Sequence, residues 1–298
     1  MPNKNALVTV APLSEQIKIF TEKQAMQEPV VRTKLMLVIV SNTMDPTIGK
    51  GCIQDMSIVR DILTKVSQEM NFNFIELIIQ GSDYGKENVL GAIDLLAPGY
   101  NDIVVFYYSG HGFSYQNDER KIYPQVDLRP QPASDKIDFI NAHTANLNDL
   151  FVLVKNKGAR LNIVIGDCCN SIIDFKRKSK GDGSSIIAER PTPLVINKET
   201  CEALFCDYTA SILVASASKG EYSVSDDDLG SIFTFNFSKG LKKLIQKERD
   251  PTIGLPWGPL LDQTTDKTLE LSKTYDIGGG VPGNQKAIYS IESRASLY

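Results

Sequence analysis

The chain has 298 residues, of which 42% are hydrophobic and 23% charged, as in an ordinary soluble globular protein with one large or two small domains. Its net charge of −4 and the lack of a Lys/Arg-rich stripe give no reason to expect a nucleic acid or an anionic membrane as partner. Five cysteines, an odd number, argue against a disulfide framework and for a reducing, cytoplasmic location. Residues 1–16 make a poor signal peptide, and no apolar run approaches the roughly 20 residues of a membrane span.

Residues 1–34 are polar and weakly patterned, and we interpret them as an N-terminal extension with one short helix around residues 14–27. Residues 35–298 carry the regular apolar patterns of a single folded domain.

The first half of this domain alternates strands and helices. Residues 35–41 form an apolar, β-branched run that predicts a buried strand, and residues 51–70 carry a helical apolar stripe. Residues 72–80 predict the next strand. Residues 86–96 predict a helix that ends before Pro98 and Gly99.

The alternation continues with a strand over residues 102–108, a helix over residues 145–158 and a strand over residues 161–166. A long polar insertion, residues 172–208, follows. Beyond it we predict further elements, which are a strand over 211–218, helices over 231–245 and 259–273, and a closing strand over 287–291.

Strands and helices that alternate at this spacing predict right-handed crossovers. The fold class is therefore α/β, with a doubly wound, mostly parallel central sheet of about six strands and helices on both faces. In such a sheet the binding crevice lies beyond the carboxyl ends of the strands.

Two strands end in residues that could perform nucleophilic catalysis. The strand over 102–108 runs into S-G-H-G, which contains His111, and the strand over 161–166 runs into D-C-C-N-S, which contains Cys168 and Cys169. A thiol is nucleophilic only as thiolate, and a neighbouring imidazole is the usual activating group. The two segments together predict a cysteine–histidine site.

These motifs resemble those of the caspase-like cysteine proteases, and those of metacaspases and their bacterial relatives more than those of animal caspases. The metacaspase pattern runs Asp, small residue, nucleophilic Cys, His, Ser, Gly, and Asp167 and Ser171 match it, while Asn170 and Ile172 depart from it. Later segments, S-A-S, G-S-I-F-T and N-Q-K-A-I-Y, also resemble landmarks of the family, so the resemblance covers about residues 35–292.

The spacing from Asp167 favours Cys169 as nucleophile, with Cys168 as the competing candidate, because neighbours on an extended segment point in opposite directions. His111 would be the general base. The backbone N–H of Gly112, together with that of Cys169, could stabilise an oxyanion. The other histidine, His143, sits at the predicted start of a helix and has no motif around it.

The resemblance to metacaspases implies that Asp167 floors the primary specificity pocket, with Asp55, Ser109 and Cys52 beside it. G-C-I-Q-D (51–55) is similar to the family's G-C-x-N-D in the loop after the first strand, with Gln54 in place of Asn. An acidic pocket suits a basic substrate side chain. The alternative for Asp55 is an acid that favours a helix N-terminus.

No cofactor is required by this chemistry. Many metacaspases are activated by calcium, and two acidic stretches, Asp118–Glu119 and Asp226–Asp228, could supply oxygen ligands. Neither is a clear match to the family's aspartate cluster, and a solvated loop is the simpler interpretation. Cys201 and Cys206 alone are weak evidence for zinc.

The sequence thus predicts a cysteine endopeptidase that cleaves a protein or peptide after Arg or Lys and cuts itself within the basic insertion. Two alternatives remain open. One is a catalytically silent module of the same fold that binds a basic peptide or scaffolds a signalling complex. The other is an enzyme that cleaves after Asp, although the matching pocket positions are acidic here. The oligomeric state is not predicted.

Overall fold

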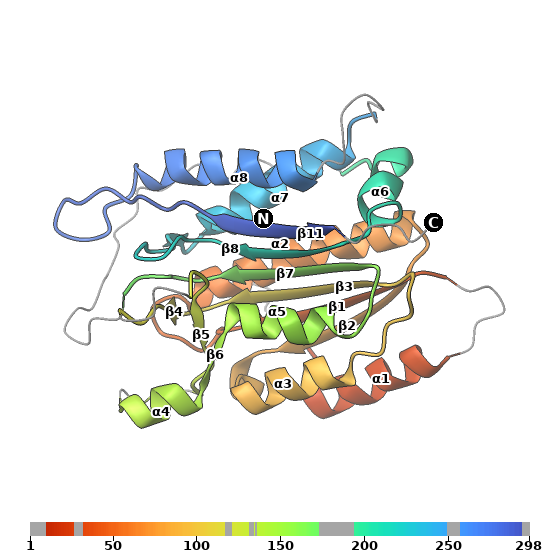
Figure 1. The fold of residues 1–298 in the computed structure, drawn as a ribbon, viewed down its shortest axis with the longest axis horizontal. Helices are drawn as coiled ribbons and strands as arrows, with labels where there is room; N and C mark the ends of the chain where they lie inside the picture. The colour runs from red at the N-terminus through yellow and green to blue at the C-terminus, as the bar shows by residue number, and fades with distance from the viewer. Residues whose placement is uncertain are drawn as a thin grey trace, which may run out of the picture.

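A six-stranded sheet lies at the centre of the structure (Figure 1). The computed structural model describes residues 10–26, 32–116, 121–130, 134, 136–172, 194–248 and 257–293 of the chain. In spatial order the strands are β11 (Ile288–Ser293), β8 (Ala210–Ala215), β7 (Leu161–Asp167), β3 (Ile103–Ser109), β1 (Lys34–Ser41) and β2 (Asn73–Ile79). Neighbouring strands are parallel, except that β11 runs antiparallel to β8.

Both faces of the sheet are covered, which is why its strands are almost continuously apolar. Along β1, Leu35, Leu37 and Ile39 belong to one buried cluster, whereas Met36 and Val38 belong to the other. The first cluster is completed by α2 (Gly49–Glu69), α6 (Lys198–Phe205), α7 (Ile232–Ile245) and α8 (Trp257–Ser272). The second is completed by α1 (Leu13–Ala25), α3 (Lys86–Leu95) and α5 (Leu147–Lys155), which lie below the sheet in Figure 1.

The helix expected within the N-terminal extension is α1, and it packs on the edge strand β2. The carboxamide of Gln16 accepts a hydrogen bond from the backbone nitrogen of Ile78 at 2.8 Å and donates to its carbonyl oxygen at 3.2 Å. An edge strand with unpaired backbone groups is prone to pair with other chains. The Gln16 side chain closes this part of the edge.

Short elements that the sequence did not predict surround the carboxyl ends of the parallel strands. They are a 3₁₀ turn η1 (Gly81–Asp83), the strands β4 (Gly112–Phe113), β5 (Gln125–Asp127) and β6 (Thr144–Asn146), the helix α4 (Ile137–Ala142), and the hairpin β9 (Ser225–Asp226) and β10 (Gly230–Ser231). Strands of two or three residues carry no periodic signal, so only tertiary contacts define them.

The predicted fold class and its six main strands are confirmed. Within the predicted insertion the structure describes residue 172 and residues 194–208. The second of these segments contains α6, which the sequence analysis did not predict, and Cys201 and Phe205 of this helix are fully buried in the first cluster. This end of the range is therefore part of the core.

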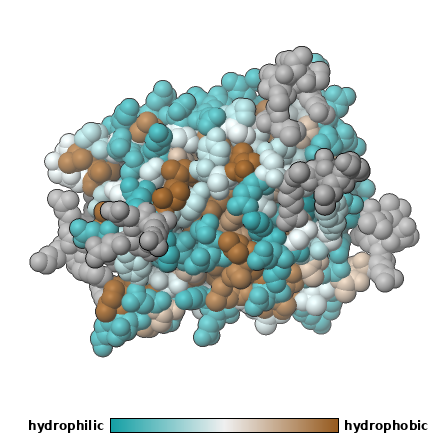
Figure 2. All heavy atoms as spheres, in the orientation of Figure 1, coloured by the Kyte–Doolittle hydropathy of each residue, from teal (hydrophilic) through white to brown (hydrophobic). Residues whose placement is uncertain are grey.

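Polar and apolar side chains are interspersed over the face seen in Figure 2, as on most folded proteins. In the part of the chain that the structure describes, no helix combines the length and apolar character needed to cross a bilayer.

Candidate active site

The register of β3 and β7 brings the two motifs side by side. Ser109 pairs with Asp167 at the ends of these strands, and His111 and Cys169 each follow two residues later. The segments stay together beyond the strands, because the nitrogen of Ser114 donates to the carbonyl oxygen of Ser171 at 2.8 Å. The sheet therefore brings both motifs together at the carboxyl ends of β3 and β7.

The two adjacent cysteines lie in different environments. Cys168 is 2% exposed and belongs to the apolar cluster below the sheet. Cys169 is half-buried, and its Sγ lies 3.3 Å from the backbone nitrogen and 3.6 Å from the backbone oxygen of Ser223. Cys169 is therefore the more accessible thiol, as the nucleophile assignment requires.

Burial raises the pKa of the Cys169 thiol to about 11, and the nearby Asp167 adds to this rise, while the hydrogen bond with the Ser223 backbone opposes it. Burial raises the pKa of Cys168 well above its usual value. Cys169 is thus a neutral thiol at pH 7, and a proton acceptor is needed before it can attack a carbonyl.

Gly112 lies directly against the cysteine segment. A Cβ atom at this position would fall 2.5 Å from the carbonyl oxygen of Cys169 and 2.5 Å from Sγ of Cys168. Only glycine allows the two backbones to approach so closely. Gly112 is accordingly required by the close approach of these two segments, whatever its part in catalysis.

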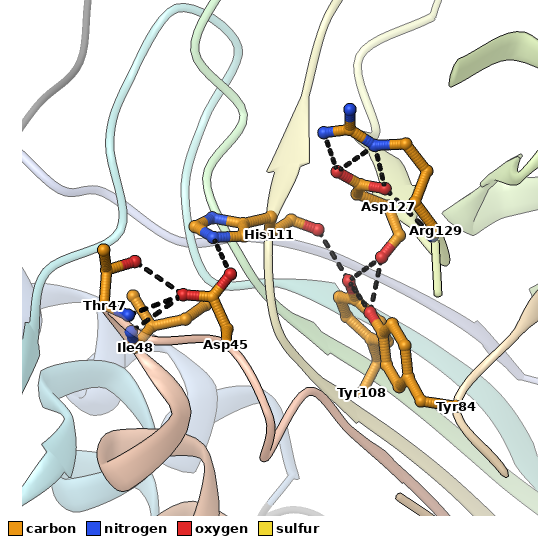
Figure 3. Close-up of polar contacts among 8 residues, drawn as sticks. All are labelled: Asp45, Thr47, Ile48, Tyr84, Tyr108, His111, Asp127 and Arg129. Carbon is orange, nitrogen blue, oxygen red and sulfur yellow. Dashed lines mark hydrogen bonds and ion pairs between the residues drawn. The ribbon is translucent and has the colours of Figure 1, made fainter. Parts of the chain in front are cut away.

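The imidazole of His111 contacts a carboxylate that the sequence analysis did not consider (Figure 3). Its Nε2 lies 3.0 Å from Oδ2 of Asp45, in the loop between β1 and α2. Oδ1 of Asp45 accepts hydrogen bonds from the nitrogen and hydroxyl of Thr47, at 2.8 and 2.6 Å, and from the nitrogen of Ile48, at 3.1 Å. Burial opposes the charge, but the hydrogen bonds to His111 and Thr47 outweigh it, so the pKa of Asp45 lies well below its usual range.

Hydrogen bonds of buried tyrosine hydroxyl groups support the backbone at His111 (Figure 3). The Tyr108 hydroxyl lies 2.6 Å from the carbonyl oxygen of His111 and 2.9 Å from that of Asp127. Tyr84 donates to the same Asp127 oxygen and lies 2.9 Å from the Tyr108 hydroxyl. Arg129 forms an ion pair with the Asp127 carboxylate at 2.7 Å. This network fixes the turn that carries His111.

The residues expected to form an acidic pocket do meet. Asp55 is 1% exposed and Asp167 is 4% exposed. Ser109 Oγ donates to Oδ2 of Asp55 at 2.8 Å, and the backbone nitrogen of Ser231 donates to Oδ1 at 2.7 Å. Cys52 lies one helical turn before Asp55 and is 3% exposed. Residues 52 and 55 stand in the first turns of α2, in agreement with the helix predicted over residues 51–70, and not in the loop that the resemblance to G-C-x-N-D implied.

Asp167 accepts three side-chain hydrogen bonds, none of which was expected from the sequence. Its donors are the hydroxyl groups of Ser231 at 2.8 Å, Thr234 at 2.6 Å and Ser223 at 3.2 Å. Ser231 and Thr234 fall inside G-S-I-F-T, which was noted only for its resemblance to a family landmark. The resemblance of this segment to the family landmark was the feature of the sequence from which Ser231 and Thr234 could have been found.

Burial raises the pKa of both Asp55 and Asp167, and the charge of Asp167 raises that of Asp55 further. Among the residues that the structure describes, neither carboxylate pairs with a Lys or Arg side chain. Two adjacent buried acids without a cation are electrostatically unfavourable. A cationic group entering this region would relieve that cost.

The remaining sequence candidates lie elsewhere. His143 ends α4 rather than starting a helix, and its Nδ1 lies 2.8 Å from the carbonyl oxygen of Phe139. Asp226 accepts hydrogen bonds from the nitrogens of Asp228 and Leu229, within the turn of its own hairpin. Residues 118 and 119 lie outside the described part of the chain. Within that part, no three His, Cys, Asp or Glu side chains are grouped so as to hold a metal ion.

The chain was compared with known protein families, curated proteins and solved structures. Residues 33–254, more than half of the chain, match the family model described as Caspase domain. The fold is also similar to a chain titled "Crystal Structure of Caspase-1 from Spodoptera frugiperda", with a TM-score of 0.43 and 14% sequence identity, over 90% of this chain and 93% of that chain. No curated protein is significantly similar in sequence.

Proposed function

Since the chain belongs to the caspase-domain family of cysteine peptidases, we propose that it is an endopeptidase that cleaves protein or peptide chains after Arg or Lys, with Cys169 as nucleophile and His111 as general base. The observation that carries the specificity is the pair of buried carboxylates, Asp55 and Asp167. Ser223 contacts both the Cys169 thiol and the Asp167 carboxylate. A substrate side chain at these acids would therefore lie next to the thiol.

In the proposed reaction, His111 accepts the thiol proton of Cys169 while sulfur forms a bond to the scissile carbonyl carbon. The backbone N–H groups of Gly112 and Cys169 stabilise the oxyanion, at about 3 kcal/mol for one such donor. The imidazolium then protonates the leaving amine as the C–N bond breaks. Water, deprotonated by the same imidazole, hydrolyses the thioester and restores the thiol.

Guanidinium fits the acidic pair better than ammonium. A carboxylate can form two parallel hydrogen bonds with Arg but only a point contact with Lys. The buried hydroxyl groups around Asp55 and Asp167 already supply donors from the protein side, which supports these carboxylates as fixed acceptors. We therefore expect Arg to be preferred over Lys, and Asp to be rejected by like charge.

A peptide library that varies the residue before the scissile bond tests the proposal. The purified protein should cleave Arg peptides fastest, then Lys peptides. Cys169→Ala and His111→Ala should each abolish cleavage, and the double variant should be no worse than either one, because the two residues act as a unit. Preference for Asp, or undiminished cleavage by Cys169→Ala, would refute it.

The second candidate is a catalytically silent module that binds a basic peptide. It is favoured by one observation, the contact of the Cys169 thiol with the Ser223 backbone in place of a free, ionised sulfur. An activity-based probe with an arginyl recognition element separates the two functions. Covalent labelling at Cys169 supports the peptidase, whereas reversible binding of Arg peptides without labelling supports the module.

The proposed reaction needs no cofactor. Peptidase activity measured with EDTA and with added calcium tests this directly, and equal rates in both are expected. Self-processing within residues 172–208 follows from the same basic specificity, since Arg177, Lys178, Lys180 and Arg190 lie in that range. Its test is given in the Discussion.

A further inference from the structure

The Asp45 carboxylate has two oxygens with different tasks. Oδ1 is occupied by the backbone N–H groups of Thr47 and Ile48 and by the Thr47 hydroxyl. Oδ2 faces Nε2 of His111. The side chain is 9% exposed, so it is held in this orientation by the protein. An ionised carboxylate only accepts hydrogen bonds, and Nε2 must therefore carry a proton.

We propose that Asp45 is a positioning residue that fixes the tautomer of His111, with the proton on Nε2 and the lone pair on Nδ1. The inference rests on the proposed function, because it gives the lone pair of Nδ1 to the thiol proton of Cys169. When that proton moves, Nδ1–H forms, the sulfur electrons enter the new C–S bond, and the Nε2 proton stays between His111 and Asp45. The carboxylate then faces an imidazolium and stabilises it.

The hydrogen bonds on Oδ1 make a sharp distinction between two substitutions. The N–H groups of Thr47 and Ile48 are obligatory donors, so in Asp45→Asn the amide oxygen must take the place of Oδ1. The amide NH₂ then faces Nε2, which has to accept. The ring proton moves to Nδ1, and a neutral His111 can no longer receive the thiol proton. Asp45→Ala removes the preference for the Nε2-protonated tautomer of His111 and does not favour the Nδ1-protonated one.

The isosteric substitution should thus be the more damaging one. We expect kcat to fall on the order of 10³–10⁴-fold in Asp45→Asn and by a smaller factor in Asp45→Ala, with KM for an Arg substrate little changed in both. Thr47→Val keeps both backbone donors and should change kcat only a few-fold. Asp94→Asn, at a side chain that is 80% exposed, is the matched control. An Asp45→Ala variant as impaired as Asp45→Asn would overturn the proposal.

A direct measurement does not depend on activity or on the folding of any Asp45 variant. The chain has 2 histidines, so ¹⁵N chemical shifts of the imidazole nitrogens in Cys169→Ala, with and without His143→Gln, report the tautomer of His111 at a pH where the ring is neutral. A protonated Nε2 and a bare Nδ1 are expected, with the reverse in Cys169→Ala carrying Asp45→Asn. A proton on Nδ1 beside the native Asp45 would disprove the proposal. Because the Cys169→Ala protein is used, this result stands apart from the peptidase assay, and failure of the proposed function alone would show as unchanged cleavage by Cys169→Ala.

Discussion

The Sγ atom of Cys169 lies 3.3 Å from the backbone nitrogen of Ser223. The hydroxyl of the same serine donates to the Asp167 carboxylate at 3.2 Å. One residue of the loop after β8 therefore joins the candidate nucleophile to the candidate specificity acid. Among the described residues the Cys168 thiol has no such connection, since this side chain is buried in the apolar cluster below the sheet.

This difference predicts the outcome of two single substitutions. Cys169→Ala should abolish peptidase activity, whereas Cys168→Ala should keep a substantial part of it, because Cys169 is the less buried of the two residues. The measurement is cleavage of an arginyl peptide by both variants. Mass spectrometry after brief alkylation gives the control, since the half-buried Cys169 should be modified before the buried Cys168. Loss of cleavage in Cys168→Ala but not in Cys169→Ala, together with faster alkylation of Cys168, would identify Cys168 as the nucleophile.

Asp167→Asn keeps the shape of this side chain and removes its charge. We expect it to lower kcat/KM for Arg substrates. The ratio of wild-type to variant kcat/KM should correspond to a loss of about 2–4 kcal/mol of transition-state stabilisation, the range for losing one partner of a buried charge pair. Substrates with a neutral residue at the same position, already poor, should hardly change. If the variant cleaved Arg and neutral peptides in the wild-type ratio, Asp167 would not line the specificity pocket.

Asp55→Asn should stabilise the protein at neutral pH. Burial and the charge of Asp167 raise the pKa of Asp55 above the usual value of 3.8. An acid with a raised pKa contributes stability below its unfolded pKa, and this contribution is lost as the pH rises through the folded pKa. The difference in unfolding free energy between Asp55→Asn and the wild type should therefore increase as the pH rises above about 4. Asparagine does not suffer this loss of stability, and its side-chain oxygen can still accept a hydrogen bond from the Ser231 nitrogen.

Thermal unfolding from pH 4 to pH 8 measures this effect. We expect the Tm of Asp55→Asn to match that of the wild type near pH 4 and to exceed it by roughly 2–6 °C at pH 8, given about 2–4 °C per kcal/mol for a domain of this size. Asp94→Asn, at an exposed side chain, serves as control and should show a constant difference. A wild type that is more stable at pH 8 would contradict the raised pKa.

Two neighbouring tyrosines of β3 offer a matched pair. The Tyr108 hydroxyl donates a hydrogen bond to the carbonyl oxygen of His111. The Tyr107 hydroxyl lies 2.6 Å from the Thr234 hydroxyl, and the Thr234 hydroxyl donates to Asp167. Phenylalanine at either position should lower stability by about 1–2 kcal/mol. We expect Tyr108→Phe to lower kcat about 10-fold and Tyr107→Phe to raise KM for Arg substrates. Identical kinetic effects of the two would argue that both act only through stability.

Self-processing is tested by incubating wild type and Cys169→Ala in parallel. The basic residues Arg177, Lys178, Lys180 and Arg190 should yield fragments with new ends within residues 172–208 in the wild type, while the variant stays intact. Mass spectrometry of both proteins over time gives the cleavage sites. Fragments with the same ends in Cys169→Ala would indicate a contaminating protease.

The apolar pattern of the chain was enough to predict the sheet and the place of the two motifs. Burial imposes a period on strands and helices, so β1, β3 and β7 could be located from their apolar residues alone. Because parallel strands end at the same edge, the residues after β3 and β7 had to meet there, and the prediction that Asp55, Ser109 and Asp167 come together followed from the resemblance to a family.

The side chains that complete the site could not be predicted from the sequence and were identified in the three-dimensional structure. Asp45 reaches His111, and Ser223, Ser231 and Thr234 reach Asp167, across long separations in sequence. Contacts of this kind depend on where a loop or a helix end lies against the sheet, and this placement leaves no periodic trace in the chain. For the same reason the helix α6 and the short strands at the carboxyl ends of the parallel strands were seen only in three dimensions, because their residues are fixed by packing against distant segments and not by a local pattern.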